Sequence, residues 1–596
     1  MFDDSFSRSP LSAEALEELA ALARAGGQQN RRQRSNRRGS PLWQQLGKAR
    51  GPVFAGLRQG GQLRAVGWAE SDPNSKRRWG DALCDALKRL KTAMSAAPEH
   101  PPAAIELALL HEPRRLSPWS NRKDRAFLFS NAKRGLLGLK LSVGSASQRW
   151  TPFDVLAANR GARKLFERFC EQRGISEQDL QRRGRVTAWK TLQYVIPLRG
   201  DAPASPMYRG TRIVAPAAVT RANVELLTHR LGDYLFEHVG PDGALTYLTD
   251  PALGEDIDGS NNMIRQWMAT CAMSRHARFY DQQARFELVA RNIRHNLERY
   301  YVERPSPDGD GTHGVIEFNR LAKLGAIALS ALAIYEHPER AAFADAFEGL
   351  RRTVRWMWEA NGGEGSFYTL YRPLSDEHAR NFYPGEALLL WAFLYQESRD
   401  PALLERIMKS MRFYRDWHRK PENRKPAFIP WHAQAYYVVW QHTRDPELRD
   451  WIFEMSDWLL SMQRVRARFP DAAGQFYDPK REEFGPPHSS STGVYIEGLI
   501  DAFALARELG DEARRERYRE AIVRGIRNIM QLTYLDPVEA WYGFDPARVI
   551  GGVRSNIYNN RIRCDNVQHN LMGILKVLER FEDADFDHPA GSIVLD

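Results

Sequence analysis

The most regular feature of the chain, from about residue 220 onward, is an alternation of amphipathic and strongly apolar helical stretches. An amphipathic stretch such as "NVELLTHRLGDYLFEHV" leads through a long connection into a more apolar one such as "ALLLWAFLY". Apolar residues at helical spacing predict six helix pairs. The first members are predicted at 223–239, 282–303, 338–360, 400–419, 445–466 and 512–534. The second members are predicted at 261–280, 319–336, 384–397, 431–443, 492–509 and 566–581.

The connections between these helices repeat as well. Short aromatic segments precede several of the second helices, namely "DGALTYLTDP", "GSFYTLYRP", "GQFYDP" and "AWYGFDP". The turns after the second helices are brief, as in "SRDPALL" and "TRDPELR". An internal repeat of helix pairs indicates units that stack on their neighbours. The sequence therefore predicts a mainly α ring, with apolar helices inside, amphipathic helices outside and short strands on one face.

This pattern resembles the six-hairpin, (α/α)6 toroids of the glycosidase-like superfamily, over residues 216–585. That superfamily includes glycoside hydrolases, sugar epimerases, polysaccharide lyases and lanthionine cyclases. The resemblance implies the fold and a carbohydrate ligand, and it leaves the reaction open among these classes.

Residues 51–215 have a different pattern, typical of an α+β unit. "GPVFAGLRQGGQLRAVGWAE" predicts a hairpin, "WGDALCDALKRLKTAM" a helix, and "AAIELALLHEPRRL" and "GLLGLKLSVG" strands. The order of these segments resembles the AMMECR-like domain. Where that family carries Leu-Arg-Gly-Cys-Ile-Gly, this chain has Leu63, Arg64, Ala65, Val66 and Gly67. The cysteine is missing, and no function is derived from the resemblance.

Composition adds one further expectation about the N-terminus. The 596-residue chain is 43% apolar, 11% aromatic and carries a net charge of +11, which allows two or three folded units. The segment "GGQQNRRQRSNRRGS" holds five arginines and no apolar residue. We expect residues 1–50 to form a mostly flexible basic tail with one short helix, and 586–596 a C-terminal tail. Contact of the basic segment with an anionic partner is the alternative, and nucleic-acid binding finds no other support.

Several function classes are disfavoured by what the sequence lacks. The four cysteines are far apart without CxxC spacing, so neither a disulfide framework nor a structural zinc site is predicted. An apolar stretch of about 18 residues is absent, so no membrane span is predicted. The acidic N-terminus does not have the architecture of a signal peptide. We expect a soluble cytoplasmic protein that needs no cofactor.

The candidate site lies where the inner helices begin, because in such a ring these beginnings converge on one cavity. Charged and amide side chains are concentrated there. The candidate catalytic residues are Asp258, Glu386, Glu497, Asp565 and His569. The candidate substrate-binding residues are Asn262, Arg265, Gln266, Tyr383, Trp431, His432, Gln434, Tyr495, Arg563, Asn566 and Gln568.

Helix capping explains some of these charged and amide residues. Asp565, with Gln568 three residues later, fits a capping box. Capping does not explain polar residues one turn inside apolar helices, such as Glu386 before "ALLLWAFLY" and Glu497 before "GLIDAFALA". Ionised groups in such surroundings must be paired, solvated by a cavity or shifted in pKa. Their recurrence on most inner helices predicts a lined cavity.

Two carboxyl groups across such a cavity suit glycosidic chemistry, in which one protonates the leaving oxygen and the other activates water or attacks. Glu386 and Glu497 lie two hairpins apart, and Asp258 and Asp565 are alternatives for either role. Tyr383 and Tyr495 could instead transfer protons, as an epimerase or lyase requires. Trp431 is interpreted as a residue that stacks on a sugar ring. Arg265 and Arg563 are suited to binding the acidic group of a sugar.

Two other classes of function remain open from the sequence. The ring could bind glycans or act as a scaffold without catalysis. It could also be a zinc enzyme of the lanthionine-cyclase type, with Cys271, Cys564 and His569 as ligands, although that family's Trp-Cys and Cys-His-Gly motifs are absent.

Overall fold

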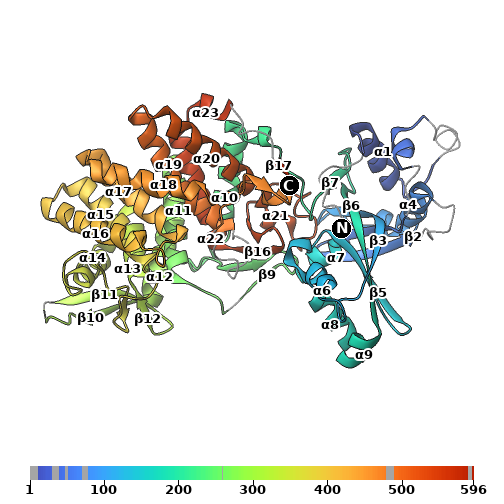
Figure 1. Cartoon of the computed structure of the whole chain (residues 1–596), viewed down its shortest axis with the longest axis horizontal. Helices are drawn as coiled ribbons and strands as arrows, with labels where there is room; N and C mark the ends of the chain where they lie inside the picture. The colour runs from blue at the N-terminus through green and yellow to red at the C-terminus, as the bar shows by residue number, and fades with distance from the viewer. Residues whose placement is uncertain are drawn as a thin grey trace.

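The computed structural model describes residues 11–29, 39–46, 51–69, 78–257, 259–309, 311–477, 489–587 and 594–595. Within these ranges, a ring of helices forms one lobe and a curved sheet with its own helices forms the other (Figure 1). None of the described helices combines the length and apolar character needed to cross a bilayer.

The inner ring is closed. Each inner helix contacts the next one along the chain, and the last contacts the first, so the described segments leave no break in the circle. The inner helices are α11 (Met263–Phe279), α13 (Leu324–Glu336), α15 (Tyr383–Ser398), α17 (Ile429–Thr443), α19 (Ser489–Glu508) and α22 (Cys564–Arg580). Nearly every side chain of α13 is buried, which explains why this stretch reads as uniformly apolar.

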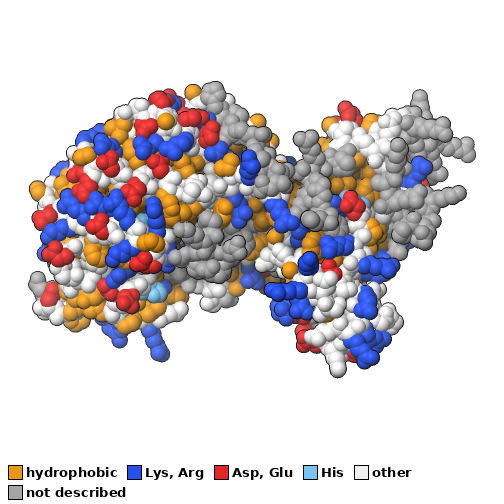
Figure 2. All heavy atoms as spheres, in the orientation of Figure 1, with side chains coloured by type: hydrophobic (Ala, Val, Ile, Leu, Met, Phe, Trp, Pro, Cys, Tyr) orange, Lys and Arg blue, Asp and Glu red, His pale blue; other side chains and the backbone are white. Residues whose placement is uncertain are grey.

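The outer helices pack on the inner ones and present charged faces to solvent, where acidic and basic side chains are interspersed (Figure 2). In α14, Leu350 and Val354 are buried while Arg351 and Arg355 are exposed, as helical periodicity requires. The outer helices are α10 (Arg221–Glu237), α12 (Gln283–Tyr300), α14 (Ala344–Glu359), α16 (Pro401–Arg419), α18 (Pro446–Leu460) and α20 (Glu512–Leu532). The prediction of a mainly α six-hairpin toroid is confirmed.

The short Arg-Asp-Pro turns between helix pairs have a common local cause. Arg399 ends α15 in the left-handed region, with φ 55°. Asp400 then accepts a hydrogen bond from Ala402 N at 2.9 Å, and Pro401 occupies the first position of α16. A left-handed residue ends a helix, an aspartate caps the next one and proline suits its first turn. The same three residue types join α17 to α18 at positions 444–446.

Short strands precede the inner helices and lie at the end of the ring where those helices begin. The four-stranded sheet with order β15-β16-β8-β9 consists of β8 (Leu248–Asp250), β9 (Glu255–Asp256), β15 (Arg554–Asn556) and β16 (Asn559–Arg563). A second sheet contains β10 (Tyr301–Pro305), β11 (Thr312–Phe318), β12 (Leu321–Lys323) and β13 (Leu370–Arg372). The remaining small elements are β14 (Arg466–Ala467), β17 (Val594–Leu595), α21 (Pro546–Val549) and α23 (Asp583–Asp587).

The N-terminal lobe is built on an antiparallel sheet whose described strands have the order β2-β1-β3-β6-β4-β5, with β7 paired to β6. Its strands are β1 (Val53–Gln59), β2 (Gln62–Ala69), β3 (Ala103–Leu116), β4 (Leu137–Val143), β5 (Ala146–Trp150), β6 (Gly184–Pro197) and β7 (Ser205–Met207). Its helices are α1 (Ala13–Arg24), α3 (Pro41–Leu46), α4 (Trp79–Lys88), α5 (Lys91–Ala96), α6 (Arg122–Phe129), α7 (Pro152–Ala157), α8 (Ala162–Arg173) and α9 (Glu177–Arg183). The resemblance to the AMMECR-like domain stays a prediction.

Among the described residues, the sheet contributes to three apolar cores, two of which meet on β1. On β1, Val53 and Ala55 pack with α1 and α4, whereas the intervening Phe54 belongs to the core that continues into the ring. This alternation follows from the two-residue period of a strand. Helices α1 and α3 lie within the segment for which the sequence predicts a mostly flexible tail, and both bury leucines against the sheet. The basic segment holding the clustered arginines, 30–38, lies outside the described residues.

Candidate active site at the mouth of the ring

The beginnings of α11 and α22 are joined by ion pairs around Asp565. Its Oδ2 lies 2.9 Å from Nε of Arg265 and accepts a hydrogen bond from Nη2 of Arg563 at 2.8 Å. Burial alone would raise the pKa of Asp565, but the two guanidinium groups outweigh burial and hold the pKa below its ordinary value. Arg563, not Asp565, occupies the N-cap position of α22. Asp565 is therefore a paired charge and not the helix cap that its spacing to Gln568 allowed.

Arg265 also donates a hydrogen bond to the hydroxyl of Tyr247. Tyr247 comes from the aromatic connection "DGALTYLTDP", just before β8. Burial raises the pKa of its hydroxyl, and the Arg265 charge opposes that shift. Tyr247 was not among the predicted site residues, although the repeated aromatic segments before the inner helices are a sequence signal that could have indicated it.

Glu386, in the first turn of α15, is only 2% exposed. It lies against the backbone of α13, because a Cβ atom added to Gly325 would be 1.8 Å from its Oε2. Oε2 has no hydrogen-bond partner among the described residues. Burial raises the pKa of Glu386 to about 8, against the opposing charge of Lys323. The helix dipole favours the charged form of a carboxyl group in the first turn. Burial outweighs that effect here, so Glu386 is protonated at neutral pH.

Lys323 connects this carboxyl to the Asp565 cluster. It directly precedes α13, and burial followed by the Arg265 charge lowers its pKa, while Glu386 raises it. Tyr383 begins α15, and burial followed by the Glu386 charge raises the pKa of its hydroxyl. Electrostatic interactions thus link the beginnings of α22, α11, α13 and α15.

One turn further along α22 than Asp565, His569 forms a pair with Glu497 of α19. Nδ1 of His569 lies 2.8 Å from Oε1 of Glu497, whose other oxygen accepts a hydrogen bond from Nε2 of Gln434 at 3.4 Å. Glu497 is fully buried, whereas the His569 side chain is 14% exposed and meets the Trp431 ring edge-on at 5.9 Å. A carboxylate acceptor at Nδ1 leaves Nε2 of the imidazole for another partner. The buried Glu497 can therefore influence a ligand at the mouth through its hydrogen bond to His569.

Lys576, further along α22, holds Glu497 and Gln434 in place. Nζ of Lys576 donates hydrogen bonds to the Glu497 carbonyl at 2.7 Å, to Gln434 Oε1 at 3.2 Å and to Asp501 Oδ2 at 2.6 Å. Burial lowers the pKa of Lys576 to about 8, and Asp501 opposes the shift. The sequence analysis named neither residue, although an aspartate inside the apolar run "GLIDAFALA" was a visible signal.

Several predicted binding residues have structural roles near the mouth. Asn262 caps α11, since its side chain accepts hydrogen bonds from the backbone of Ile264 and Arg265. Gln266 donates to the Leu245 carbonyl at 3.1 Å and to Asn261 at 3.0 Å. These contacts hold the start of α11 and its preceding loop in place.

The other predicted binding residues are buried. His432 is near the start of α17, stacked on Phe428 at 3.6 Å, and a Cβ atom added to Gly385 of α15 would be 3.2 Å from its Nε2. Tyr495 is buried against Phe476. Asn566 donates to Ser555 Oγ at 3.1 Å, and Gln568 is buried, with neither side-chain polar atom bonded among the described residues. Asp258 lies outside the described residues.

The zinc-ligand set is not assembled. Cys271 faces the Leu329 carbonyl, and Cys564 is the first residue of α22, packed with Leu245 and Ala269. Across the described ranges, no three His, Cys, Asp or Glu residues are placed to hold one metal ion. The sequence-based alternative of a Cys271, Cys564 and His569 site therefore receives no support from the geometry.

A large groove of about 840 Å³ lies on the outer ring, between α14 and α16, and not at the mouth. Its arginines are mostly neutralised, since Arg340 pairs with Glu397 at 2.8 Å and Arg406 with Glu359 at 3.2 Å. A similar open groove lies between α18 and α20. Gaps between outer helices are thus a regular property of the ring, whereas the convergent, perturbed titratable groups are at the mouth.

The buried carboxyl of Glu386 gives stability a defined pH dependence. Its folded-state pKa of about 8 exceeds the ordinary value of 4.5, so its stabilisation is fully present below pH 4.5 and is lost as pH rises to 8. We expect the E386Q variant to gain up to about 4 kcal/mol relative to wild type between pH 5 and pH 9. Urea unfolding at both pH values measures this gain. Parallel pH dependence in the two proteins would contradict a buried, protonated Glu386.

Comparison with known proteins places the chain beside several solved structures. No family model and no curated protein matches it. An inactive variant of the alpha-1,6-mannanase of Salegentibacter sp. HEL1_6, in complex with alpha-1,6-mannotriose, is 11% identical, with a TM-score of 0.42. The match covers 60% of this chain and 99% of the mannanase.

Two further structures have the same extent of similarity. Cellobiose 2-epimerase from Bacillus thermoamylovorans B4167 is 11% identical over 61% of this chain and 100% of its own, with a TM-score of 0.43. A protein from Listeria innocua is 14% identical over 61% of this chain and 97% of its own, with a TM-score of 0.42. At these identities the function of this chain has to follow from its own mouth residues.

Proposed function

We propose that the mouth of the ring is the active site of a carbohydrate-active enzyme, of the glycoside hydrolase or sugar epimerase class, acting on an oligo- or polysaccharide. The observation that carries this proposal is the contrast between two groups. Glu386 is a buried carboxylic acid with an unpaired oxygen, and His569 is an imidazole oriented by a carboxylate. A carboxyl group that is protonated in its buried site can donate a proton, and an imidazole with a free ring nitrogen can accept one.

In this proposal Glu386 is the general acid and His569 the general base. For hydrolysis, Glu386 gives its proton to the leaving glycosidic oxygen while His569 Nε2 takes one from the attacking water. For epimerisation, His569 removes the proton from the carbon next to a carbonyl while Glu386 protonates the carbonyl oxygen. After the enol has turned, His569 returns a proton to the opposite face of that carbon and Glu386 takes its proton back from the oxygen. Both schemes conserve protons and use the same two residues. Glu497 is then a positioning residue that acts through His569.

The surrounding residues suit a sugar. Trp431 lies edge-on to His569, and Tyr247 lies under the guanidinium of Arg265; aromatic residues are common in sugar sites because their rings stack on the apolar faces of sugars. Arg265 is about one-third exposed, and Lys323 has no ion-pair partner among the described residues. These two cations favour a substrate with an acidic substituent. Glycan binding without catalysis remains the second candidate, because Glu386 and Glu497 are both buried.

The test is a turnover screen of the purified full-length protein with neutral and acidic oligosaccharides. Hydrolysis adds one water to the product mass, whereas epimerisation leaves the mass unchanged and introduces deuterium from D2O at the reacting carbon. Binding that raises Tm without any turnover would favour the glycan-binding candidate.

Variants of His569 on α22 and Glu497 on α19 distinguish the general base from the residue that positions it. We expect His569→Ala to lower kcat by about 10²–10⁴-fold. Glu497→Gln should retain more activity and shift the pH profile of kcat, since it alters the orientation and basicity of the imidazole. The matched control His442→Gln, at an exposed histidine in the last turn of α17, should leave the pH profile unchanged. Full activity in His569→Ala would exclude its role as base.

A further inference from the structure

Positive charge is concentrated in the N-terminal lobe. Residues 51–215 contain 29 Lys and Arg against 14 Asp and Glu, whereas residues 216–585 contain 47 against 53. Figure 2 shows basic side chains prominent on the N-terminal lobe, at the right, and both signs interspersed over the ring. An excess of one sign on one domain is the electrostatic footprint of a partner of opposite charge.

Part of this charge is gathered on one face of the sheet. Arg115 of β3 and Lys140 of β4 both pair with Thr187 of β6, and Lys140 also pairs with Arg149 of β5. Residues that pair directly across neighbouring strands point to the same face of a sheet. Arg185, two residues before Thr187 on β6, points to this face as well. We call the four cations Arg115, Lys140, Arg149 and Arg185 the basic face.

The basic face is accessible, whereas the other face of the same strands is covered. Helices α6, α8 and α9 pack on the other face, where Leu141 and Val186 alternate with the basic residues. On the basic face, Arg115 and Arg185 are exposed and Lys140 is half-buried. Among the described residues, none of these three cations forms an ion pair. Ion pairing within the lobe therefore leaves their charges available to a ligand.

The sheet curls around the basic face. The guanidinium of Arg149 lies over the Trp68 ring, 5.4 Å from its centroid, although β5 and β2 are the two ends of the strand order. Arg149 is also directly opposite Lys140, and like charges placed in this way destabilise a sheet. A bound polyanion would offset that repulsion, so the arrangement favours binding and not the stability of the fold.

The neighbouring side chains on this face distinguish between polyanions. Thr187 and Ser142 lie between the cations and offer hydroxyl groups. Trp68 is half-buried beneath Arg149, and Trp189 is buried, so the described part of the face presents no well-exposed aromatic ring. Proteins that bind single-stranded nucleic acid rely on such rings to stack bases. Cations and hydroxyls without a stacking surface suit an acidic polysaccharide, whose carboxylates and hydroxyls they can hydrogen-bond.

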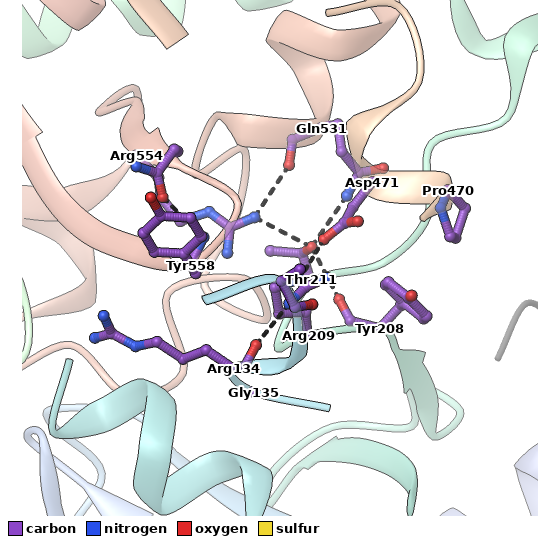
Figure 3. Close-up of polar contacts among 12 residues, drawn as sticks. Arg134, Gly135, Tyr208, Arg209, Thr211, Pro470, Asp471, Gln531, Arg554 and Tyr558 are labelled. Atoms are coloured by element: carbon purple, nitrogen blue, oxygen red, sulfur yellow. Dashed lines mark hydrogen bonds and ion pairs between the residues drawn. The ribbon is translucent and has the colours of Figure 1, made fainter. Parts of the chain in front are cut away.

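The N-terminal lobe is held on the ring, on the side where the inner helices begin. Asn159 Nδ2 donates to Asn559 Oδ1 at 3.0 Å, in the turn between β15 and β16. Arg209 donates to Asp471 of the ring at 2.7 Å and, through Nη1, to the carbonyl of Arg134 at 2.7 Å (Figure 3). These contacts fix the basic face in position relative to the mouth.

We propose that the basic face binds an acidic polysaccharide and holds it beside the ring. The choice of a polysaccharide rests on the proposed function of the mouth, where Arg265 and Lys323 suit the same kind of acidic sugar. The basic face shares no residue with the proposed acid and base, so binding of the polymer and its turnover can be measured separately.

The experiment measures binding of the full-length protein to polygalacturonate, with dextran as the neutral polymer and single-stranded poly(U) RNA as a second polyanion. We expect saturable binding to polygalacturonate that weakens as NaCl rises from about 50 to about 300 mM, because salt screens exposed charges. Dextran should not bind. Absence of binding to polygalacturonate, equal binding to dextran, or tighter binding to RNA at the same ionic strength would overturn the proposal.

A double variant tests whether the basic face is responsible. Arg115→Gln with Lys140→Gln removes two unpaired cations and should weaken polygalacturonate binding by at least about tenfold, with Tm unchanged. Arg168→Gln with Arg173→Gln, at exposed positions on α8, removes the same charge from the covered side and should keep the affinity within about threefold. Equal losses in both double variants, or no loss in the first, would overturn the proposal. Should the first fail to fold, Arg185→Gln replaces it, with an expected loss of at least about threefold.

Variants at the mouth separate this proposal from the proposed function. E386Q and His569→Ala should bind polygalacturonate as tightly as the wild-type protein. Binding that depends on the basic face, in a protein that turns over no glycan, would support this proposal and contradict the proposed enzyme. Turnover of acidic oligosaccharides without binding at the basic face would do the reverse.

Discussion

Replacing Glu386 by glutamine is expected to reduce kcat/KM by about 10²–10⁴-fold, the usual contribution of a positioned general acid. Glutamine fills the same space against Gly325 and Lys323 but has no acidic proton to give. Because the carboxyl is neutral in the folded protein at pH 7, glutamine should preserve the fold, and it should raise the stability at that pH because it removes the ionisation that favours the unfolded chain. Steady-state kinetics on the substrate identified in the turnover screen, with circular dichroism as the folding check, measures the effect.

Glu397→Gln is the matched control for this result. Glu397 is on the same helix, at its far end, in an exposed ion pair with Arg340. It should therefore keep wild-type kinetics. Wild-type kcat/KM in E386Q would remove Glu386 from the mechanism. Loss of activity together with loss of the folded signal would show a structural role instead.

The second large effect is on stability. Asp471→Ala is expected to lower the free energy of unfolding by about 3–5 kcal/mol, because it leaves the fully buried guanidinium of Arg209 without its carboxylate. Urea unfolding at neutral pH measures the loss. An exposed pair provides the comparison, since Glu167→Ala at the Arg163–Glu167 contact should cost at most about 1 kcal/mol.

A double variant tests the cause of that loss. Arg209→Met with Asp471→Leu removes both charges and fills similar volumes, so it should recover most of the stability lost in Asp471→Ala. A double variant as unstable as the single one would mean that packing or backbone hydrogen bonds of Arg209, and not its unpaired charge, determine the effect.

The ring could be predicted from the sequence because its causes are local. Helical spacing of apolar residues marks each helix, and the Arg-Asp-Pro turns at 399–401 and 444–446 end one helix and start the next through their own backbone preferences. These signals do not depend on distant residues. The helix α1 is the one short helix predicted near the N-terminus, whereas α3 was harder to predict, because its stability comes from burying leucines against a sheet formed by later residues.

The candidate site could be predicted only in part. Charged residues inside apolar helices pointed to the mouth, and the structure links Glu386, Lys323, Arg265 and Asp565 there. Which partner each charge takes depends on helices distant in the sequence. Residue spacing along one helix could therefore not show that Glu497 is paired with His569, and it suggested a cap for Asp565.

The core that continues from Phe54 of the sheet into the ring constrains how the sequence of this protein can evolve. A side chain on the sheet is a neighbour of ring residues several hundred positions away in the chain, as the position of the Arg58 guanidinium of β1 over the Trp541 ring illustrates. Substitutions on one lobe therefore need compensating substitutions on the other. The two lobes are constrained to evolve as one unit, and recombination with the equivalent lobe of another protein would disrupt their shared packing.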